Sequence, residues 1–330
     1  PPPSTLMAVI SSTFKSSHNK HLRPFDARRD MTAAADLIEF CFGDSMDPDG
    51  KRYLSRMRAA AKDKGLSRWT AMANGRTSFP LAGFVWEEGG RLVGNLSMVS
   101  FFTPGRRIFM IANISVYPEY RRRGIARALT EAALQKSRQR WAQAVWLQVR
   151  DDNPTAANLY ASLGFEPRAR RTTWNIKPEM LPGETPQGVN VTPRKFRHWS
   201  RQRTWLEQNY PKEIRWHLPL KIPALRPGLW GMAHRFFTET YIRQWAIQRD
   251  NRLLGVLSWQ ASRSHADRFW LAARPESEDA ALESLLPFIR QEQYLRRPVS
   301  LDYPAGRAVE ALQSAGFTPE STLLWMEAKL

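Results

Sequence analysis

The sequence predicts an α/β protein with a mixed sheet, in which one folding unit is present twice. Segments typical of strands and helices alternate after an early hairpin, and this favours a mixed α/β sheet. The pattern of residues 21–180 recurs in residues 191–330. The chain has 330 residues, of which 42% are hydrophobic, and this length and composition can supply two apolar cores.

The first elements of the N-terminal copy follow from the spacing of apolar residues. Residues 22–27 are predicted as an opening strand, and residues 31–42 and 51–63 as two helices. Residues 84–102 read as a hairpin that turns at Gly89-Gly90.

The remaining elements of this copy alternate regularly. A buried strand is predicted over residues 107–117, and a helix follows over residues 124–140. A second buried strand covers residues 144–149, and a second helix covers residues 153–163. A last strand ends at Trp174.

Four landmarks recur in the same order further along the chain. They predict two copies of one domain, residues 21–180 and 191–330, after an extension at residues 1–20. A linker rich in Pro and Gly separates the copies at residues 181–190, and the Trp- and Arg-rich residues 199–245 would form the first helices of the second copy. The matched pairs are RLVGNLS (91–97) with RLLGVLS (252–258), Pro118-Glu119 with Pro275-Glu276, residues 156–167 with 308–319, and Trp174 with Trp325.

The charge is high and uneven. The formal net charge is +18, and residues 51–150 hold 19 Lys and Arg against 5 Asp and Glu. Such a field attracts nucleic acid, and it equally attracts a polyanionic cofactor. One cysteine, Cys41, excludes an internal disulfide, and the six histidines lack the spacing of metal ligands, so no metal is predicted. No apolar run is long enough to span a bilayer, and we expect a cytoplasmic protein without a membrane partner.

The run YRRRGIARALT (120–130) lies where a strand turns into a helix. The first N–H groups of a helix have no partner within it, and the helix dipole adds positive potential there. Gly124 or Ala126 would let an anion approach the backbone, with Arg121, Arg122, Arg123 and Arg127 around it. The glycine spacing of dinucleotide folds and the GK[ST] of a P-loop are both missing from this run. The run therefore predicts a phosphate site.

Here the sequence resembles the Gcn5-related N-acetyltransferase (GNAT) superfamily. Arg121-Arg-Arg-Gly124-Ile125-Ala126, after a strand reading ISV, is similar to the acetyl-CoA-binding motif of that family. The stretch NPTAANLYASLGF (153–165) is similar to the second family signature. The resemblance covers residues 22–175 well and residues 190–330 faintly. It implies a tandem pair of GNAT folds and an N-acetyltransferase that uses acetyl-CoA as cosubstrate.

The resemblance also implies roles for the matched positions. Backbone N–H groups from Arg122 to Arg127, including Ile125, would hold the diphosphate. The strand segment Ile114-Ser115-Val116 would pair with the pantetheine arm as an added strand does, and one of its N–H groups could stabilise the oxyanion. Asn153 would bind the pantetheine.

Tyr160 would protonate the leaving thiolate, as the resemblance implies. The alternative for Tyr160 is an ordinary core aromatic. The resemblance does not supply a general base, because the strand IANIS lacks a carboxylate. Asp151, Asp152, a water relay and the loop GDSMDPDG (43–50) remain open, and this loop could instead be a helix cap and turn.

The alignment of the two copies indicates that the second copy lacks the phosphate site. Gly124 aligns with Ala281, and Glu278 and Asp279 align with two of the arginines. Leu312 replaces Tyr160, and Ala305 replaces Asn153. The tandem layout resembles mycothiol synthase and related two-domain acetyltransferases. In mycothiol synthase the C-terminal copy works, so its substrate does not carry over.

Three functions compete at this point. The leading one is acetyl transfer from acetyl-CoA to a primary amine of a small molecule or peptide, by a monomer or homodimer. The second is a basic protein associated with nucleic acid, which the scarcity of aromatic residues in 120–140 disfavours. The third is an acyl-CoA sensor without catalysis, which the intact first motif disfavours.

Overall fold

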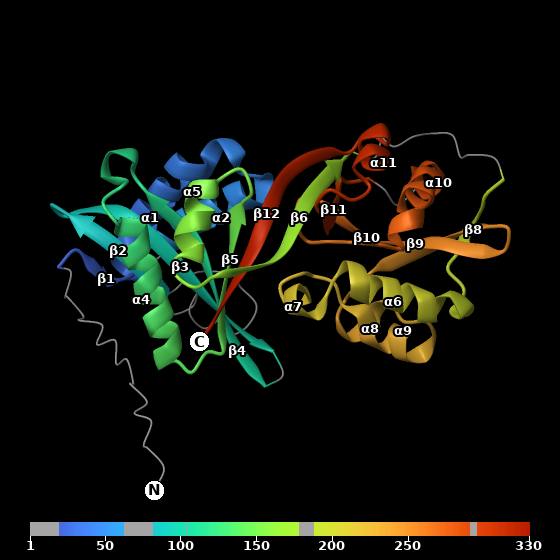
Figure 1. Ribbon diagram of the computed structural model, residues 1–330, viewed down its shortest axis with the longest axis horizontal. Coiled ribbons are helices and arrows are strands. Elements are labelled where there is room, and N and C mark those ends of the chain that lie inside the picture. Colours follow the sequence, from blue (N-terminus) through green and yellow to red (C-terminus); the bar gives the residue numbers. More distant parts are fainter. Residues whose placement is uncertain (1–19, 63–81, 104, 178–187, 291–295) are drawn as a thin grey trace, which may run out of the picture.

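The computed structural model describes residues 20–62, 82–103, 105–177, 188–290 and 296–330. Most of the expected extension and most of the expected linker lie outside these residues. Figure 1 shows two lobes joined through a continuous sheet. None of the helices in the described ranges is long and apolar enough to cross a membrane.

The first copy forms the elements that the sequence predicts, within a few residues at each end. The hairpin, the strand before the arginines and the helix after Gly124 are all confirmed. The elements are β1 (Leu22–Pro24), α1 (Ala27–Phe42), η1 (Gly43–Ser45), α2 (Pro48–Lys62), β2 (Ala82–Glu88), β3 (Arg91–Thr103), β4 (Arg106–Val116), η2 (Pro118–Tyr120), α4 (Ile125–Gln139), β5 (Ala144–Arg150), α5 (Pro154–Ala161) and β6 (Glu166–Ile176).

The second copy repeats this order, but between its first two strands it has four helices where the described part of the first copy has α1 and α2. Residues 199–237 are largely helical, as predicted, whereas residues from 242 onward already form a strand. The elements are β7 (Asn190–Pro193), η4 (Phe196–His198), α6 (Trp199–Asn209), α7 (Lys212–Arg215), α8 (Ile222–Leu225), α9 (Gly228–Phe237), β8 (Ile242–Arg249), β9 (Arg252–Gln260), β10 (Asp267–Ala273), η5 (Pro275–Ser277), α10 (Glu278–Arg290), β11 (Val299–Pro304), α11 (Val309–Ser314) and β12 (Thr318–Lys329).

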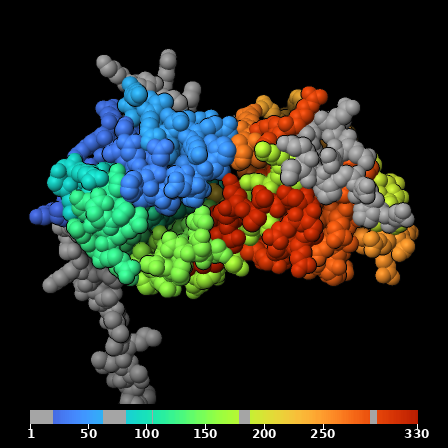
Figure 2. All heavy atoms as spheres, turned by 90° about the horizontal axis from the view of Figure 1, so that it is seen from above, coloured from blue at the N-terminus to red at the C-terminus, as the bar shows by residue number. Residues whose placement is uncertain are grey.

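The strands form one twelve-stranded sheet in the order β1-β2-β3-β4-β5-β12-β6-β11-β10-β9-β8-β7. The pairs β4–β5 and β10–β11 are parallel, and every other pair is antiparallel. The last strand, β12, lies between β5 and β6, so the end of the second copy completes the sheet of the first. Figure 2 shows, from above, red residues near the end of the chain against yellow-green residues of the first copy.

Neighbouring residues of a strand point to opposite faces of the sheet. In the first copy both faces carry buried apolar residues, and helices cover both faces. Val85 packs under α1 and α2, whereas Trp86 joins the core that α4 covers. Close packing of α4 depends on Gly94, where a Cβ would lie 2.8 Å from Ile125. A third core fills the second copy and extends beneath β4 and β5 through Ile108 and Trp146.

Candidate active site

The turn between β4 and α4 exposes backbone donors to solvent. The first helical hydrogen bond runs from the Ala128 N–H to the Gly124 carbonyl at 3.0 Å, so the three preceding N–H groups have no helical partner. Gly124 has φ +78°, and a Cβ there would meet nothing within 4 Å. Arg122 also has a positive φ, 65°. We call residues 120–127 the arginine turn.

The arginines of this turn are exposed, as expected, but most are tied to nearby oxygen atoms. Arg122 is the exception, since its side chain makes no hydrogen bond or ion pair with any of the described residues. The other contacts are Arg121 Nε to the Val116 carbonyl (3.0 Å), Arg123 Nη2 to the Glu119 carbonyl (3.0 Å) and Nη1 to Glu88 (3.7 Å), and Arg127 Nη2 to Ser162 Oγ (2.7 Å) and Nη1 to Glu131 (3.9 Å).

The parallel strands β4 and β5 separate beside this turn. They pair only over Ile108–Ile111 and Ala144–Leu147, and β4 then bends at Asn113, which has φ 54°. The register between β3 and β4 shifts at the same place. Residues 112–116 therefore diverge from β5, and we call the gap the strand opening.

Alternation of the backbone decides which groups face the strand opening. Tyr117 N–H donates to Val93 in β3 at 3.1 Å, so the backbone of Ser115 faces β3 as well. The backbone groups of Ile114 and Val116 face the strand opening instead. The Val116 carbonyl already accepts from Arg121, and from Cys41 Sγ at 3.7 Å.

Asn153 and Tyr160 lie at the two ends of α5. Asn153 is exposed and caps the helix, since its Oδ1 accepts from the Ala156 N–H at 3.1 Å. Tyr160 is 7% exposed and packs edge-on against Phe165. Burial raises the pKa of Tyr160 to about 12, so its phenol is protonated at neutral pH. Its hydroxyl makes no hydrogen bond with any described residue, and it is therefore available to another group.

A cavity of about 360 Å³ opens where the two copies meet, and we call it the junction pocket. Phe42 of its wall follows Cys41, whose Sγ donates to the Val116 carbonyl at the strand opening. On the far side, the Asp151 N–H after β5 donates to Thr322 of β12 at 3.1 Å. The pocket is lined by Phe42, Ser45, Met46, Asp47, Thr173, His265, Arg268, Ser300, Glu320, Ser321 and Leu323.

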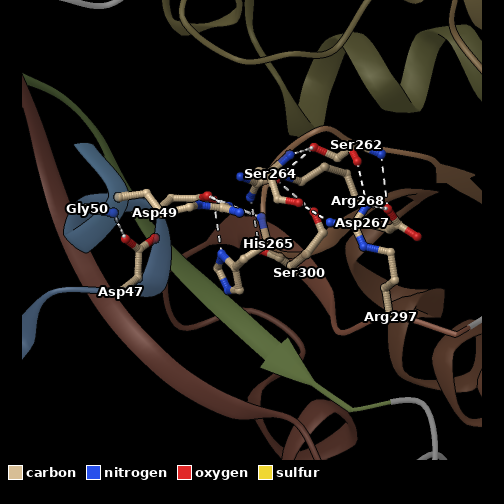
Figure 3. A network of polar contacts seen from close by, with 12 residues as sticks. Asp47, Asp49, Gly50, Ser262, Ser264, His265, Asp267, Arg268, Arg297 and Ser300 are labelled. Carbon is tan, nitrogen blue, oxygen red and sulfur yellow. Dashed lines mark hydrogen bonds and ion pairs between the residues drawn. The ribbon is translucent and has the colours of Figure 1, made fainter. Parts of the chain in front are cut away.

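Figure 3 shows a histidine–aspartate pair across the junction. His265 Nδ1 lies 3.0 Å from Asp49 Oδ2, and the His265 backbone N–H donates to the same carboxylate at 3.1 Å. Burial raises the pKa of Asp49, but hydrogen bonds from His265 and Arg52 outweigh it and lower the pKa to about 2. One polar atom each of Asp47, Asp49 and His265 lies within 4.8 Å of the others.

The other sequence-based candidates for a general base are held in ion pairs. Asp151 pairs with Arg170 at 2.5 Å, and Asp152 pairs with Arg150 at 2.8 Å. Sequence reasoning reached the loop 43–50 but missed His265, which is 216 positions from Asp49. No motif surrounds His265, so only its contact with Asp49 identifies it. The expectation that no metal is bound stays a prediction.

The equivalent turn of the second copy differs. Helix α10 begins at Glu278 directly after η5, without the four-residue turn that precedes α4. We expected Glu278 to face a phosphate position, and this is wrong. Its carboxylate is buried and accepts from Tyr303 Oη at 2.6 Å and from Arg307 Nη2 at 2.7 Å, because a buried charge needs partners. Asp279 is exposed in the first turn of α10.

Comparison with known proteins agrees with this geometry. Residues 51–165 match the acetyltransferase (GNAT) family and form a domain of that family. The [ribosomal protein bS18]-alanine N-acetyltransferases of Escherichia coli K12 and Salmonella typhimurium are 45% and 43% identical over 53 residues. This segment is 16% of the chain and spans 36% of each relative's length.

Solved structures share the fold over nearly the whole chain. A GCN5-related N-acetyltransferase from Sphaerobacter thermophilus superposes with a TM-score of 0.56 at 14% identity, over 94% of this chain and 96% of that one. A glucosamine N-acetyltransferase region of a fungal multi-domain GH3 β-N-acetylglucosaminidase gives 0.53 at 10% identity, over 93% and 37%. At these identities the likeness shows the fold alone.

Proposed function

We propose that the chain transfers the acetyl group of acetyl-CoA to a primary amine of a small molecule or peptide. The observation that carries the proposal is the strand opening beside the arginine turn. Acetyl-CoA has a diphosphate, an arm with two amides and a thioester in that order. The start of α4 offers N–H groups for the diphosphate, and the neighbouring edge of β4 offers N–H groups for the arm and the thioester. The family match over residues 51–165 supports this activity.

The chain's backbone fits the cosubstrate. The N–H groups at the start of α4 would hold the diphosphate, with the unpaired Arg122 beside them. The N–H groups of Ile114 and Val116 would bind the arm or the developing oxyanion. The Val116 carbonyl would contribute little, since Arg121 and Cys41 already occupy it.

The junction pocket would receive the amine. Its wall carries Asp47 and Glu320, and Asp49 lies beside it with His265. Carboxylates at the mouth of a site attract a cationic amine to a domain that is otherwise basic. Basic peptides and polyamines are the acceptors that this pocket favours.

Two side chains would move the protons. Acetyl-CoA supplies the activated acyl carbon. His265, held by Asp49 through Nδ1, would take a proton from the amine through Nε2 as the new C–N bond forms. Tyr160 would give its proton to the sulfur as the C–S bond breaks, and both groups then exchange protons with water.

The second copy would not bind acetyl-CoA. Without the turn, an anion approaching α10 meets Asp279 instead of exposed N–H groups and arginines. We propose instead that this copy walls the acceptor site, to which it contributes His265 and Arg268 of the junction pocket.

The first experiment is a screen of acetyl-CoA consumption with spermidine, free amino acids, an aminoglycoside and a basic peptide that has an N-terminal alanine. Calorimetry with acetyl-CoA should give a stoichiometry near one per chain. Binding without turnover of any amine would favour the sensor. A stoichiometry near two would refute an inert second copy.

A further inference from the structure

A second and larger cavity shares no lining residue with the junction pocket. It measures about 1120 Å³, and we call it the basal cavity. Its wall is formed by the start of β4 at Arg106, by Trp146 of β5 and by residues of α6 to α8. Arg106 and Val116 are the two ends of β4, roughly 30 Å apart at about 3.3 Å per residue. The basal cavity is therefore distinct from the proposed acetyl-CoA site.

The lining of the basal cavity is strongly cationic. Eight Lys and Arg face three Glu. Two of these carboxylates are already engaged, Glu327 by Arg168 at 2.9 Å and by Arg106 at 3.8 Å, and Glu207 by Arg203 at 2.9 Å. Five cations therefore face one remaining carboxylate, Glu213. None of the five pairs with a carboxylate of the described residues, and they are Lys212, Arg215, Lys221, Arg226 and Lys329.

Buried donors in the same wall have no acceptor. Trp146 is 3% exposed, and its Nε1 has no hydrogen-bond partner among the described residues. The same holds for Trp216 Nε1 and Arg215 Nη1. Buried donors almost always have a hydrogen-bond partner, and leaving a donor without one costs about 1–3 kcal/mol.

Apolar groups complete the lining. Three indole rings, of Trp146, Trp199 and Trp216, lie in it together with Ile108 and Leu220. Trp146 and Trp216 are already in edge contact with each other, so the partly exposed Trp199 is the indole whose face can accept a flat ring such as a nucleobase. The volume is that of a pocket for a molecule larger than a single phosphate.

From this combination we infer that the basal cavity binds a small polyanion that carries a flat ring, in chemical class a nucleoside polyphosphate. The phosphates contact the five unpaired cations, and the base contacts the face of Trp199. This site is independent of the proposed acetyl transfer, since it shares no residue with the arginine turn.

The test measures binding of GTP, inorganic tripolyphosphate and guanosine by calorimetry at fixed ionic strength. The Gly124→Glu chain is used, so that a nucleotide cannot be held at the arginine turn. GTP should bind most tightly, tripolyphosphate at least tenfold more weakly, and guanosine weakest. Equal affinity for GTP and tripolyphosphate would overturn the role of the ring, and no binding of either would overturn the site.

A charge-matched pair of variants locates the binding. Lys212→Glu/Lys221→Glu/Arg226→Glu changes three exposed cations of the cavity. Arg28→Glu/Arg249→Glu/Arg252→Glu changes three exposed cations elsewhere by the same net charge. The first should weaken GTP binding at least tenfold and the second less than threefold. Equal losses of GTP affinity in the two variants would show that a diffuse basic surface binds GTP, and would refute the cavity as the binding site. Tighter binding of a 20-nucleotide single-stranded RNA than of GTP would have the same meaning.

Discussion

The imidazole of His265 and the carboxylate of Asp49 meet at 3.0 Å across the junction of the two copies. The contact fixes the histidine ring, because Nδ1 and the backbone N–H of His265 both bind the same carboxylate. Its Nε2 is therefore turned away from Asp49. A residue of the second copy would thus complete the proton chemistry of the first.

Replacing His265 should affect the chemical step rather than cosubstrate binding. For His265→Gln we expect kcat to fall roughly 10²–10⁴-fold with acetyl-CoA affinity unchanged, the usual effect of losing a positioned base. Steady-state kinetics with the best amine of the screen, and calorimetry with acetyl-CoA, measure the two quantities.

The controls separate a base from other roles. Asp49→Asn should lower the rate less than His265→Gln, because it misorients the ring without removing it, and His234→Gln on α9 should leave the rate unchanged. A rate that EDTA abolishes and zinc restores would contradict the prediction, since Asp47, Asp49 and His265 would then act on a metal.

Gly124→Glu should abolish acetyl-CoA binding while the protein stays folded. A carboxylate at the start of α4 blocks the backbone donors and repels the diphosphate. The open space around Gly124 accommodates the side chain, although its φ of +78° costs about 1–2 kcal/mol. Calorimetry measures binding, and circular dichroism measures folding.

Gly306→Glu is the matched control for this change. Gly306 has φ +80° and is equally open, but it lies in the second copy. This variant should bind acetyl-CoA as the wild type does. If a folded Gly124→Glu protein retains wild-type affinity, the diphosphate binds elsewhere.

Tyr160→Phe separates an acid from a core aromatic. The ring and its contact with Phe165 remain, so stability and acetyl-CoA affinity should change little. The rate should fall roughly 10²–10⁴-fold, since the thiolate loses its proton donor. The measurement is kcat with chemistry shown to limit the rate, and a value within about twofold of wild type would return Tyr160 to a purely structural role.

His217 should make stability depend on pH. Burial lowers its pKa to about 4, from an ordinary value of 6.5, among Trp216, Trp325 and Phe101. In the unfolded chain His217 therefore binds a proton below about pH 6.5, whereas in the folded chain it binds one only below about pH 4. This stabilisation is complete above pH 6.5, and about 2 kcal/mol of it is lost by pH 5.

Urea unfolding at pH 7 and pH 5 tests this assignment. His217→Phe keeps an aromatic ring at the site, and its free energy of unfolding should fall by about 2 kcal/mol less than that of the wild type over this interval. If the free energy of unfolding falls equally in the two proteins between pH 7 and pH 5, groups other than His217 cause the pH dependence.

The sequence by itself determined the local parts of the site. Gly124 after three arginines predicted the exposed start of α4, because a strand-to-helix turn depends on residues within about ten positions. The apolar spacing predicted the hairpin and the following strands for the same reason. Four landmarks predicted the repeat, and the structure shows matching β9 and α10 packed at Gly255 as β3 and α4 pack at Gly94.

Only the tertiary structure decided how the copies join. The sequence suggested that each copy closes on its own last strand, ending at Trp174 and Trp325. Instead β12 lies between β5 and β6, where Thr172 and Thr322 share a hydrogen bond of 2.9 Å. The junction pocket and the pair of His265 with Asp49 follow from that arrangement. Such contacts join residues more than a hundred positions apart. No periodicity or motif indicates them, because they depend on which strand edges of the two copies pair in the one sheet.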